Sequence, residues 1–250
     1  MIVYGINPVL EALRAGRVMA LRVGTRAGGR MRELLELAHE RGVRVQHVDA
    51  DALERLARGG VHQGVVADVD DVVRDFGVEE LVRTAAGVPL IVVLDGIEDP
   101  HNVGAILRTA DAAGVDGVVM QTRRSAALGG AAAKASAGAV AHVRIAQVVN
   151  IARALEELKE AGVWTVGLAG DGAVAYDAVD LTGPSAIVVG AEGSGLRRLV
   201  RERCDFVAAI PMRGHVDSLN VSVAAGIVLF EAVRQRAAAA RPDEEGRLNG

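Results

Sequence analysis

The amino-acid sequence predicts an α/β protein whose strands form a mostly parallel sheet. Short apolar runs alternate with segments of helical spacing, and glycine-bearing loops separate them. The run PLIVVLD at residues 89–95 is continuous and apolar, as buried parallel strands are. Half of the 250 residues are hydrophobic and 24% are charged, so the chain can bury a sizeable core.

The first part of the chain, residues 1–70, is expected to be a small α/β domain. Asn7 and Pro8 are typical of the N-cap and first position of a helix, and residues 31–41 carry apolar side chains at helical spacing. The other elements expected here are strands at 20–24, 43–48 and 64–69 and a short helix at 51–57. Residues 71–87 are more charged, which predicts a linker with a helical turn or two.

The second part, residues 88–236, is expected to be a larger α/β domain with helices on both faces of its sheet. Its expected strands lie at 89–95, 115–121, 163–169, 186–190 and 206–210. Its expected helices lie at 105–113, 129–141, 148–161, 196–204 and 218–235. Residues 237–250 are rich in alanine and charge and are expected to be a flexible tail.

Charge and residue usage exclude several classes of protein. The formal net charge is −4, so any RNA or DNA site has to be local. Cys204 is the only cysteine, and the six histidines lack metal-ligand spacing, so we expect neither disulfides nor a metal site. The first residues lack a signal-peptide pattern, and no apolar run reaches the roughly 20 residues that span a bilayer. These features indicate a cytoplasmic protein with no membrane contact.

Arginines are concentrated near the start of the chain. Six of them, with no acidic residue among them, are Arg14, Arg17, Arg22, Arg26, Arg30 and Arg32. They form either a solvated surface or a face that contacts RNA phosphates. The chain has only three Phe, two Tyr and one Trp, so recognition of RNA by shape and phosphate contact is favoured over base stacking.

Two glycine-bearing loops follow apolar runs in the second domain, at 190–195 and 211–220. They carry Glu192, Ser218 and Asn220, and no basic residue is placed to hold a phosphate. Such loops at strand ends build ligand pockets in α/β enzymes, and this one favours a ligand other than a nucleoside phosphate. Taken singly, the polar residues also fit helix capping by Ser218 and Asn220 and a helix N-terminal charge at Glu192.

Three long segments resemble the sequence motifs of the SpoU/TrmH family of RNA ribose 2'-O-methyltransferases. They are DGIEDPHNVGAILRTADAAG (95–114), IVVGAEGSGL (187–196) and IPMRGHVDSLNVSVAAGIVLFE (210–231), in the family order. The opening VYGINPVLEAL and the later GGVHQGVVADV are similar to the small substrate-binding domain of the RlmB-like members. The resemblance covers nearly the whole chain apart from the tail.

The resemblance implies a SPOUT fold, in which the carboxy-terminal segment of the parallel sheet is tied in a trefoil knot. It implies S-adenosylmethionine as cofactor and a homodimer formed through the knotted domain. The cofactor would be held by backbone and apolar groups at Leu168, Ala169, Gly170, Gly190, Ile210, Met212 and Leu219. Its sulfonium is positive, which fits loops that lack a phosphate-binding cation.

The polar catalytic positions of the family match Asn102, Arg108, Glu192, Ser218 and Asn220. In the family the arginine is held to be a general base. Arginine is effectively always protonated in proteins, so anchoring the RNA phosphate and stabilising alkoxide charge is an equally consistent role for Arg108. Glu192 would orient Arg108 or a loop, and the remaining three would position the site by hydrogen bonds.

The function implied is methyl transfer to the ribose 2'-hydroxyl of a guanosine in the peptidyl-transferase region of 23S rRNA. The alternatives are methylation of another rRNA site or of tRNA, and a non-catalytic RNA-binding or ribosome-assembly protein with the same fold. A nicotinamide site at residues 170–175, which fit the pattern GxGxxA, is a weak third hypothesis because no amphipathic helix follows.

Overall fold

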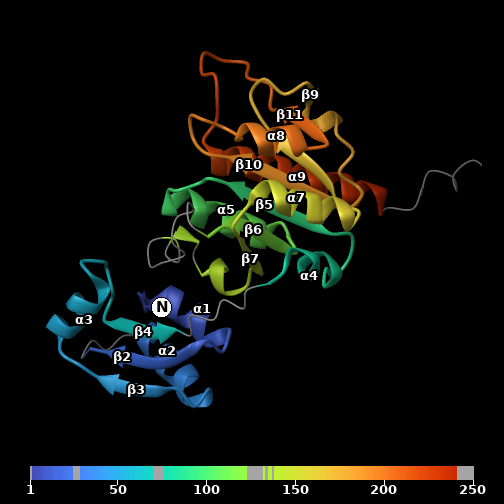
Figure 1. Ribbon diagram of the computed structural model, residues 1–250. Helices are drawn as coiled ribbons and strands as arrows, with labels where there is room; N and C mark the ends of the chain where they lie inside the picture. Colours follow the sequence, from blue (N-terminus) through green and yellow to red (C-terminus); the bar gives the residue numbers. More distant parts are fainter. Residues whose placement is uncertain are drawn as a thin grey trace, which may run out of the picture. The chain divides into compact units, whose positions relative to one another are not determined.

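The computed structural model describes residues 2–24, 29–69, 76–122, 132, 135–136 and 138–240 (Figure 1). The chain divides into two compact units. The first unit comprises Met1–Asp75, Glu98–Asp111 and Ala126–Val143. The second comprises Phe76–Ile97, Ala112–Ser125 and Arg144–Gly250.

The first unit contains a small mixed sheet, so the predicted small α/β fold is confirmed. Its described strands are ordered β1-β4-β2-β3; β1 and β2 run antiparallel to β4, and β2 runs parallel to β3. Leu13, Leu21 and Leu34 are fully buried in its core. The elements are β1 (Ile2–Tyr4), α1 (Ile6–Arg14), β2 (Val18–Val23), α2 (Gly29–Glu40), β3 (Arg44–His47), α3 (Ala50–Ala57) and β4 (Val65–Val69).

Helix α1 begins earlier than expected. Its N-cap is Gly5, whose φ of 91° is a left-handed conformation that favours glycine. The prediction of Asn7 as N-cap is therefore wrong, because Asn7 lies inside the first turn of the helix. Its Oδ1 instead accepts a hydrogen bond from Arg30 Nη1 at 3.1 Å. Strand β1, which precedes Gly5, was not predicted because three residues are too few to show an alternating pattern.

The second unit is built on a parallel sheet, as predicted. In the described part of the chain its seven strands are ordered β7-β6-β5-β10-β8-β11-β9, and every neighbouring pair is parallel. The strands are β5 (Leu90–Asp95), β6 (Gly117–Gln121), β7 (Ile145–Val148), β8 (Trp164–Leu168), β9 (Val174–Ala175), β10 (Ser185–Gly190) and β11 (Phe206–Ala209). All carboxyl ends therefore lie at the same edge of the sheet.

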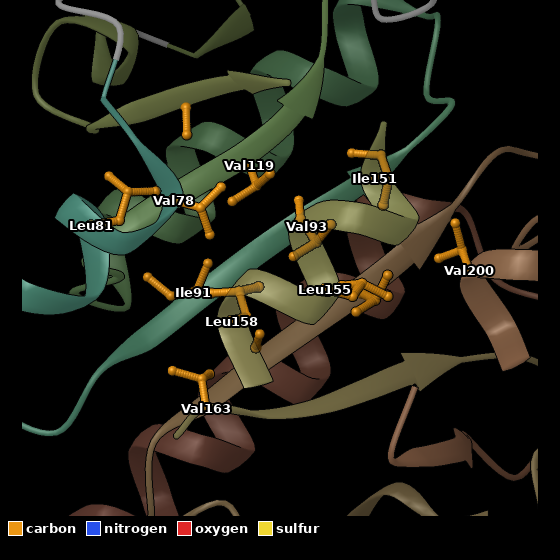
Figure 2. Close-up of a cluster of buried hydrophobic side chains, with 14 of the residues drawn as sticks. Val78, Leu81, Ile91, Val93, Val119, Ile151, Leu155, Leu158, Val163 and Val200 are labelled. Carbon is orange, nitrogen blue, oxygen red and sulfur yellow. The ribbon is translucent and has the colours of Figure 1, made fainter. Parts of the chain in front are cut away.

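One face of this sheet is covered by α4 (Val78–Arg83), α7 (Ile151–Glu160) and α8 (Arg198–Arg203). Figure 2 shows Leu81, Leu155 and Val200 of these helices packed with Ile91 of β5 and its neighbours. Helix α4 lies within residues 71–87, the segment expected to be a linker. Because Val78 and Leu81 are buried in this core, the end of that segment is part of the fold.

The other face carries the long helix α9 (Val221–Ala239). Side chains of a strand alternate between the two faces of its sheet. Along β10, Ala186 and Val188 belong to the core under α7, whereas Val189 lines a cavity together with Ala224 of α9. No helix in the described part of the chain is long and apolar enough to cross a membrane.

Three expected helices differ from those observed. Helix α5 (Pro100–Ala112) was expected to begin at Ala105, but the glycine- and proline-bearing segment before it already contains its first turn, where proline is well tolerated. Residues 148–161 were expected to form one helix, but Val148 ends strand β7 and the helix begins at Ile151. Of the helix expected at 129–141, residues 129–131, 133–134 and 137 lie outside the described part; Ala132 and Ala135 are helical, and Ala139–Ala141 form a 3-10 turn.

The far end of α9 is fixed by one guanidinium. Arg236 donates hydrogen bonds to the backbone carbonyls of Val88 at 2.7 Å, Gly183 at 2.8 Å, Pro89 at 2.9 Å and Leu181 at 3.0 Å. These carbonyls lie in the segments that lead into β5 and β10. Arg236 therefore holds the end of the helix against the amino-terminal edge of the sheet.

Arg236→Ala is expected to lower the free energy of unfolding by about 1–3 kcal/mol, because it leaves backbone carbonyls without their donor. Denaturant unfolding followed by circular dichroism measures the loss. Arg153→Ala is the matched control, since the Arg153 side chain is 78% exposed and pairs with Glu157 one turn along α7. Such a pair contributes about 0.5 kcal/mol or less. Equal losses in the two variants would contradict the anchoring role.

Candidate cofactor and catalytic site

The loop after β10 is closed on itself by two backbone hydrogen bonds. Ala191 N donates to Gly195 O at 3.1 Å, and Gly195 N donates to Ala191 O at 2.8 Å. A Cβ on Gly190 would lie 2.2 Å from the carbonyl carbon of Gly195, so only glycine fits where the loop leaves the strand. The conformation of this loop is therefore tightly determined.

A buried carboxylate holds the far side of the same loop. Asp95, at the end of β5, is 0% exposed. Its Oδ2 accepts a hydrogen bond from Arg197 N at 2.8 Å, and its Oδ1 accepts one from Arg197 Nε at 2.6 Å. Neither residue was predicted from the sequence to belong to the site; the available signal for Asp95 was an acidic residue at the end of a continuous apolar strand.

The loop after β11 meets the first loop through Asn220. Asn220 Nδ2 donates a hydrogen bond to Glu192 Oε1 at 2.9 Å. Asn220 is also the N-cap of α9, and its Oδ1 accepts a hydrogen bond from Ser222 N at 2.9 Å. The capping interpretation is therefore correct for Asn220, and the same side chain also joins the two loops. Ser218 is exposed and lies before the cap.

A cavity of about 550 Å³ lies at the carboxyl ends of β8, β10 and β11. This volume is within the roughly 300–1,000 Å³ of small-molecule sites. Glu192, Ser218 and Asn220 line it. So do all the residues predicted to hold the cofactor: Leu168, Ala169, Gly170, Gly190, Ile210, Met212 and Leu219.

The lining of the cavity fits a cofactor that carries positive charge. Glu192 and Asp217 are the charged residues among the described ones that line it, and none of these is Lys, Arg or His. Val189, Ile210 and other apolar side chains form the remaining walls, which suits a neutral adenine. The sulfonium of S-adenosylmethionine would be attracted by this charge distribution, whereas a nucleoside phosphate would be repelled.

The two remaining predicted catalytic residues lie on α5. Asn102 is buried and Arg108 is exposed. Helix α5 packs closely on the segment that follows β6, because a Cβ on Gly104 would lie 2.4 Å from Ala135 Cβ. Both residues belong to the first unit, whereas the cavity belongs to the second. The proximity of Asn102 and Arg108 to the cavity stays a prediction.

Two of the six arginines near the start of the chain form ion pairs with acids from other segments. Arg14 Nη2 lies 3.0 Å from Glu33 Oε1, and Arg22 Nη1 lies 2.7 Å from Asp68 Oδ2. The acid-free run in the sequence is therefore partly neutralised by the fold. Arg26 lies outside the described residues.

The other three arginines differ in their surroundings. Arg17 Nη1 donates a hydrogen bond to the Val140 carbonyl at 3.4 Å, and Arg30 is bonded to Asn7 as described above. Arg32 is exposed on α2. An RNA phosphate could reach Arg32 and Arg30 with the least change in existing contacts.

Clustered metal-ligating side chains and a reactive thiol are both absent from the part of the chain that the structure describes. No group of three or more His, Cys, Asp or Glu side chains is close enough there to hold a metal ion. Cys204 is half-buried, and burial raises the pKa of its thiol to about 12. Its Sγ donates to the Val200 carbonyl at 3.3 Å. Cys204 is therefore a neutral packing residue at physiological pH.

Gly190→Ala is expected to weaken binding of S-adenosylmethionine, the implied cofactor, by roughly 5- to 150-fold. The reason is that the added Cβ forces the 191–195 loop away from β10, and such overpacking costs about 1–3 kcal/mol. Isothermal titration calorimetry measures the affinity. Gly183→Ala is the control, because a Cβ at Gly183 meets nothing within 4 Å. Unchanged affinity of Gly190→Ala would contradict the tight loop as part of the cofactor site.

Comparison with known proteins assigns the chain to a family. Residues 89–230 match the family model described as the SpoU rRNA Methylase family, and residues 2–72 match RNA 2'-O ribose methyltransferase substrate binding. A Burkholderia protein named 23S rRNA (guanosine-2'-O-)-methyltransferase RlmB is 47% identical, over 94% of this chain and 96% of its own length. The Pseudomonas aeruginosa protein of the same name is 46% identical, with the same coverage.

Solved structures agree with the assignment. The SpoU methyltransferase AviRb from Streptomyces viridochromogenes, in complex with AdoMet, superposes with a TM-score of 0.78 at 27% identity over 95% of this chain and 91% of that one. An AdoMet-bound rRNA methyltransferase from Sinorhizobium meliloti gives a TM-score of 0.76 at 27% identity, over 93% of this chain and 86% of that one. The chain belongs to the SpoU rRNA methylase family and is a methyltransferase that uses S-adenosylmethionine.

Proposed function

We propose that the chain transfers the methyl group of S-adenosylmethionine to the ribose 2'-hydroxyl of a guanosine in the peptidyl-transferase region of 23S rRNA. The observation that carries the proposal is the cavity at the ends of β8, β10 and β11, with Glu192, Ser218 and Asn220 in its wall. The names of relatives that are 46–47% identical over nearly the whole chain support the 23S guanosine as target. A ribosomal RNA substrate also supports a cytoplasmic location.

The cofactor is held in this proposal by backbone groups and apolar side chains at Leu168–Gly170, Gly190, Ile210, Met212 and Leu219, which line the cavity. When bound, it supplies a methyl group on a positively charged sulfur. Glu192 is kept in one orientation by Asn220, and its negative charge complements that sulfur. Positioning of the ribose oxygen in line with the methyl–sulfur bond can lower the barrier by roughly 7–11 kcal/mol.

Arg108 is proposed to bind the RNA substrate rather than the cofactor. The 2'-oxygen forms a bond to the methyl carbon as the carbon–sulfur bond breaks, and its proton passes to water or to a nearby base. A guanidinium stays protonated in proteins, so Arg108 is proposed to hold the phosphate of the target nucleotide and to stabilise charge on the 2'-oxygen. Asn102, Ser218 and Asn220 would position the site by hydrogen bonds, and Glu192 would orient Arg108 or a loop.

The small domain is proposed to bind RNA through its arginines. Arg30 and Arg32 are exposed at the start of α2. Arg14 pairs with Glu33 and Arg22 pairs with Asp68, and each arginine would give up part of this ion pair to bind a phosphate. The net free energy gained from each phosphate contact is lower for that reason. Arg17 and Arg26 complete the predicted face.

The homodimer and the trefoil knot are part of the same proposal. Val223 and Phe230 of α9 are each 50% exposed, and Ile227, between them on the same face, is half-buried. These residues repeat at the spacing of one helix face, while the opposite face packs on β10. A helix that is apolar on both sides is expected to be covered on both, so a second copy would pack on the Val223–Phe230 face.

Methyl transfer from labelled S-adenosylmethionine to 23S rRNA and to tRNA, both from a strain that lacks the enzyme, tests the function. The wild-type protein is expected to label 23S rRNA. Arg108→Ala is expected to bind S-adenosylmethionine normally and to lose most of the transfer, because it removes contacts made with the RNA. Transfer to tRNA alone would refute the substrate, and normal turnover by Arg108→Ala would refute the role of that residue.

Phe230→Glu is expected to convert the dimer to a monomer, because it places a charge in the proposed apolar contact. Light scattering coupled to size-exclusion chromatography measures the mass. Val149→Glu is the control, since Val149 is 77% exposed and lies outside α9. A dimer that survives Phe230→Glu, or one that Val149→Glu disrupts, would argue against α9 as the interface.

A further inference from the structure

The segment between β11 and the cap of α9 is an exposed arm at the mouth of the cavity. Residues 211 and 213–218 are exposed, and no backbone hydrogen bond involves residues 211–219 in the described structure. A Cβ at Gly214 would meet nothing within 4 Å. Figure 1 draws this part of the chain as the dark-orange loop that extends beyond the sheet before α9 begins. Such a segment is free to adapt to a bound polymer.

The two ends of this arm are parts of the cavity wall. Met212 and Asp217 both line the cavity. Arg213 follows Met212 directly, and Cα atoms of consecutive residues are about 3.8 Å apart. Arg213 and His215 therefore lie in the segment that joins two residues of the cavity wall, at the rim of the cavity, and neither is among the described residues that line it.

Arg213 differs from the other arginines at this edge of the sheet. Three arginines in the loop after β10 and in α8 each contact a carboxylate: Arg197 with Asp95, Arg198 with Glu202 and Arg201 with Asp171. Arg213 has no ion pair and no hydrogen bond within the described residues. Its charge is available to a ligand without the loss of an existing contact, which makes binding of an anion more favourable.

Contrary to the expectation that no basic residue of the 211–220 loop holds a phosphate, we propose that Arg213 contacts an RNA backbone phosphate next to the target nucleotide. His215 donates a hydrogen bond to the same phosphate. This inference rests on the proposed methyl transfer to a ribose, because that reaction brings the ribose, and with it the adjoining phosphates, to the cavity mouth. The absence of cations in the cavity wall and the presence of one at its rim are then complementary. The wall accepts a positive cofactor, and the rim accepts a negative substrate.

The test measures binding of unmodified 23S rRNA, transcribed in vitro, at several salt concentrations. Arg213→Ala is expected to weaken binding roughly tenfold at low salt and to reduce the slope of log affinity against log salt by about 1. Arg213→Lys is expected to recover most of the slope, because it keeps the charge. Affinity for S-adenosylmethionine and the dimer mass are expected to stay at their wild-type values.

Arg153→Ala is the matched control, since it removes the same charge from the exposed surface of α7 and is expected to leave RNA binding unchanged. A wild-type salt slope in Arg213→Ala would overturn the proposal. So would a loss of cofactor affinity or of the dimer in that variant, because the arm would then act through the cavity or through a partner subunit. Failure of the wild-type protein to methylate RNA would instead refute the proposed function, and the binding measurement would stand apart from it.

Discussion

The hydrogen bond between Glu192 and Asn220 joins two loops that the sheet itself keeps apart. Strands β10 and β11 are not neighbours, because β8 lies between them in the sheet. The loops that follow them can meet only by crossing the carboxyl end of β8, where Leu168–Gly170 line the cavity. The contact of 2.9 Å between Glu192 Oε1 and Asn220 Nδ2 closes this crossing. The cavity therefore exists because three strand ends are bridged, and its shape depends on how firmly each loop is held.

The anchors on either side of this bridge are made from buried or well-bonded polar groups. Asp95 fixes the first loop through two hydrogen bonds to Arg197, and the tight contact at Gly190 fixes its start. The second loop ends in the cap of α9, and that helix is fastened at its other end by Arg236. These contacts lie at both edges of the sheet. The hydrogen bond between Glu192 and Asn220 therefore joins two loops whose ends are fixed in position. The arm at 211–217 lies between these fixed points and stays open to solvent.

Local patterns predicted most of the strands and helices, but they missed the short strands β1, β7 and β9. They also failed where structure depends on contacts between distant segments. The continuous apolar run at 89–95 is a parallel strand, as predicted, because such a strand is buried on both faces. The start of α5 at Pro100 was missed because glycine and proline nearby are typical of loops. The pair of Asp95 and Arg197 could not be predicted, since residues 102 positions apart in sequence meet only through the sheet. The catalytic residues were selected by resemblance to family motifs, because each one alone, including Glu192, also fits an ordinary structural role.

A double-mutant cycle on cofactor affinity tests the bridge most directly. Titration calorimetry with S-adenosylmethionine would compare the wild type, Glu192→Ala, Asn220→Ala and the double variant. Loss of the α9 cap by Asn220→Ala occurs on both sides of the cycle and cancels. If the bridge closes the cavity, the two substitutions are coupled by about 0.5–3 kcal/mol, and the double variant binds no more weakly than the worse single variant. Strictly additive effects would contradict the account, because each residue would then act on the cofactor independently of the other.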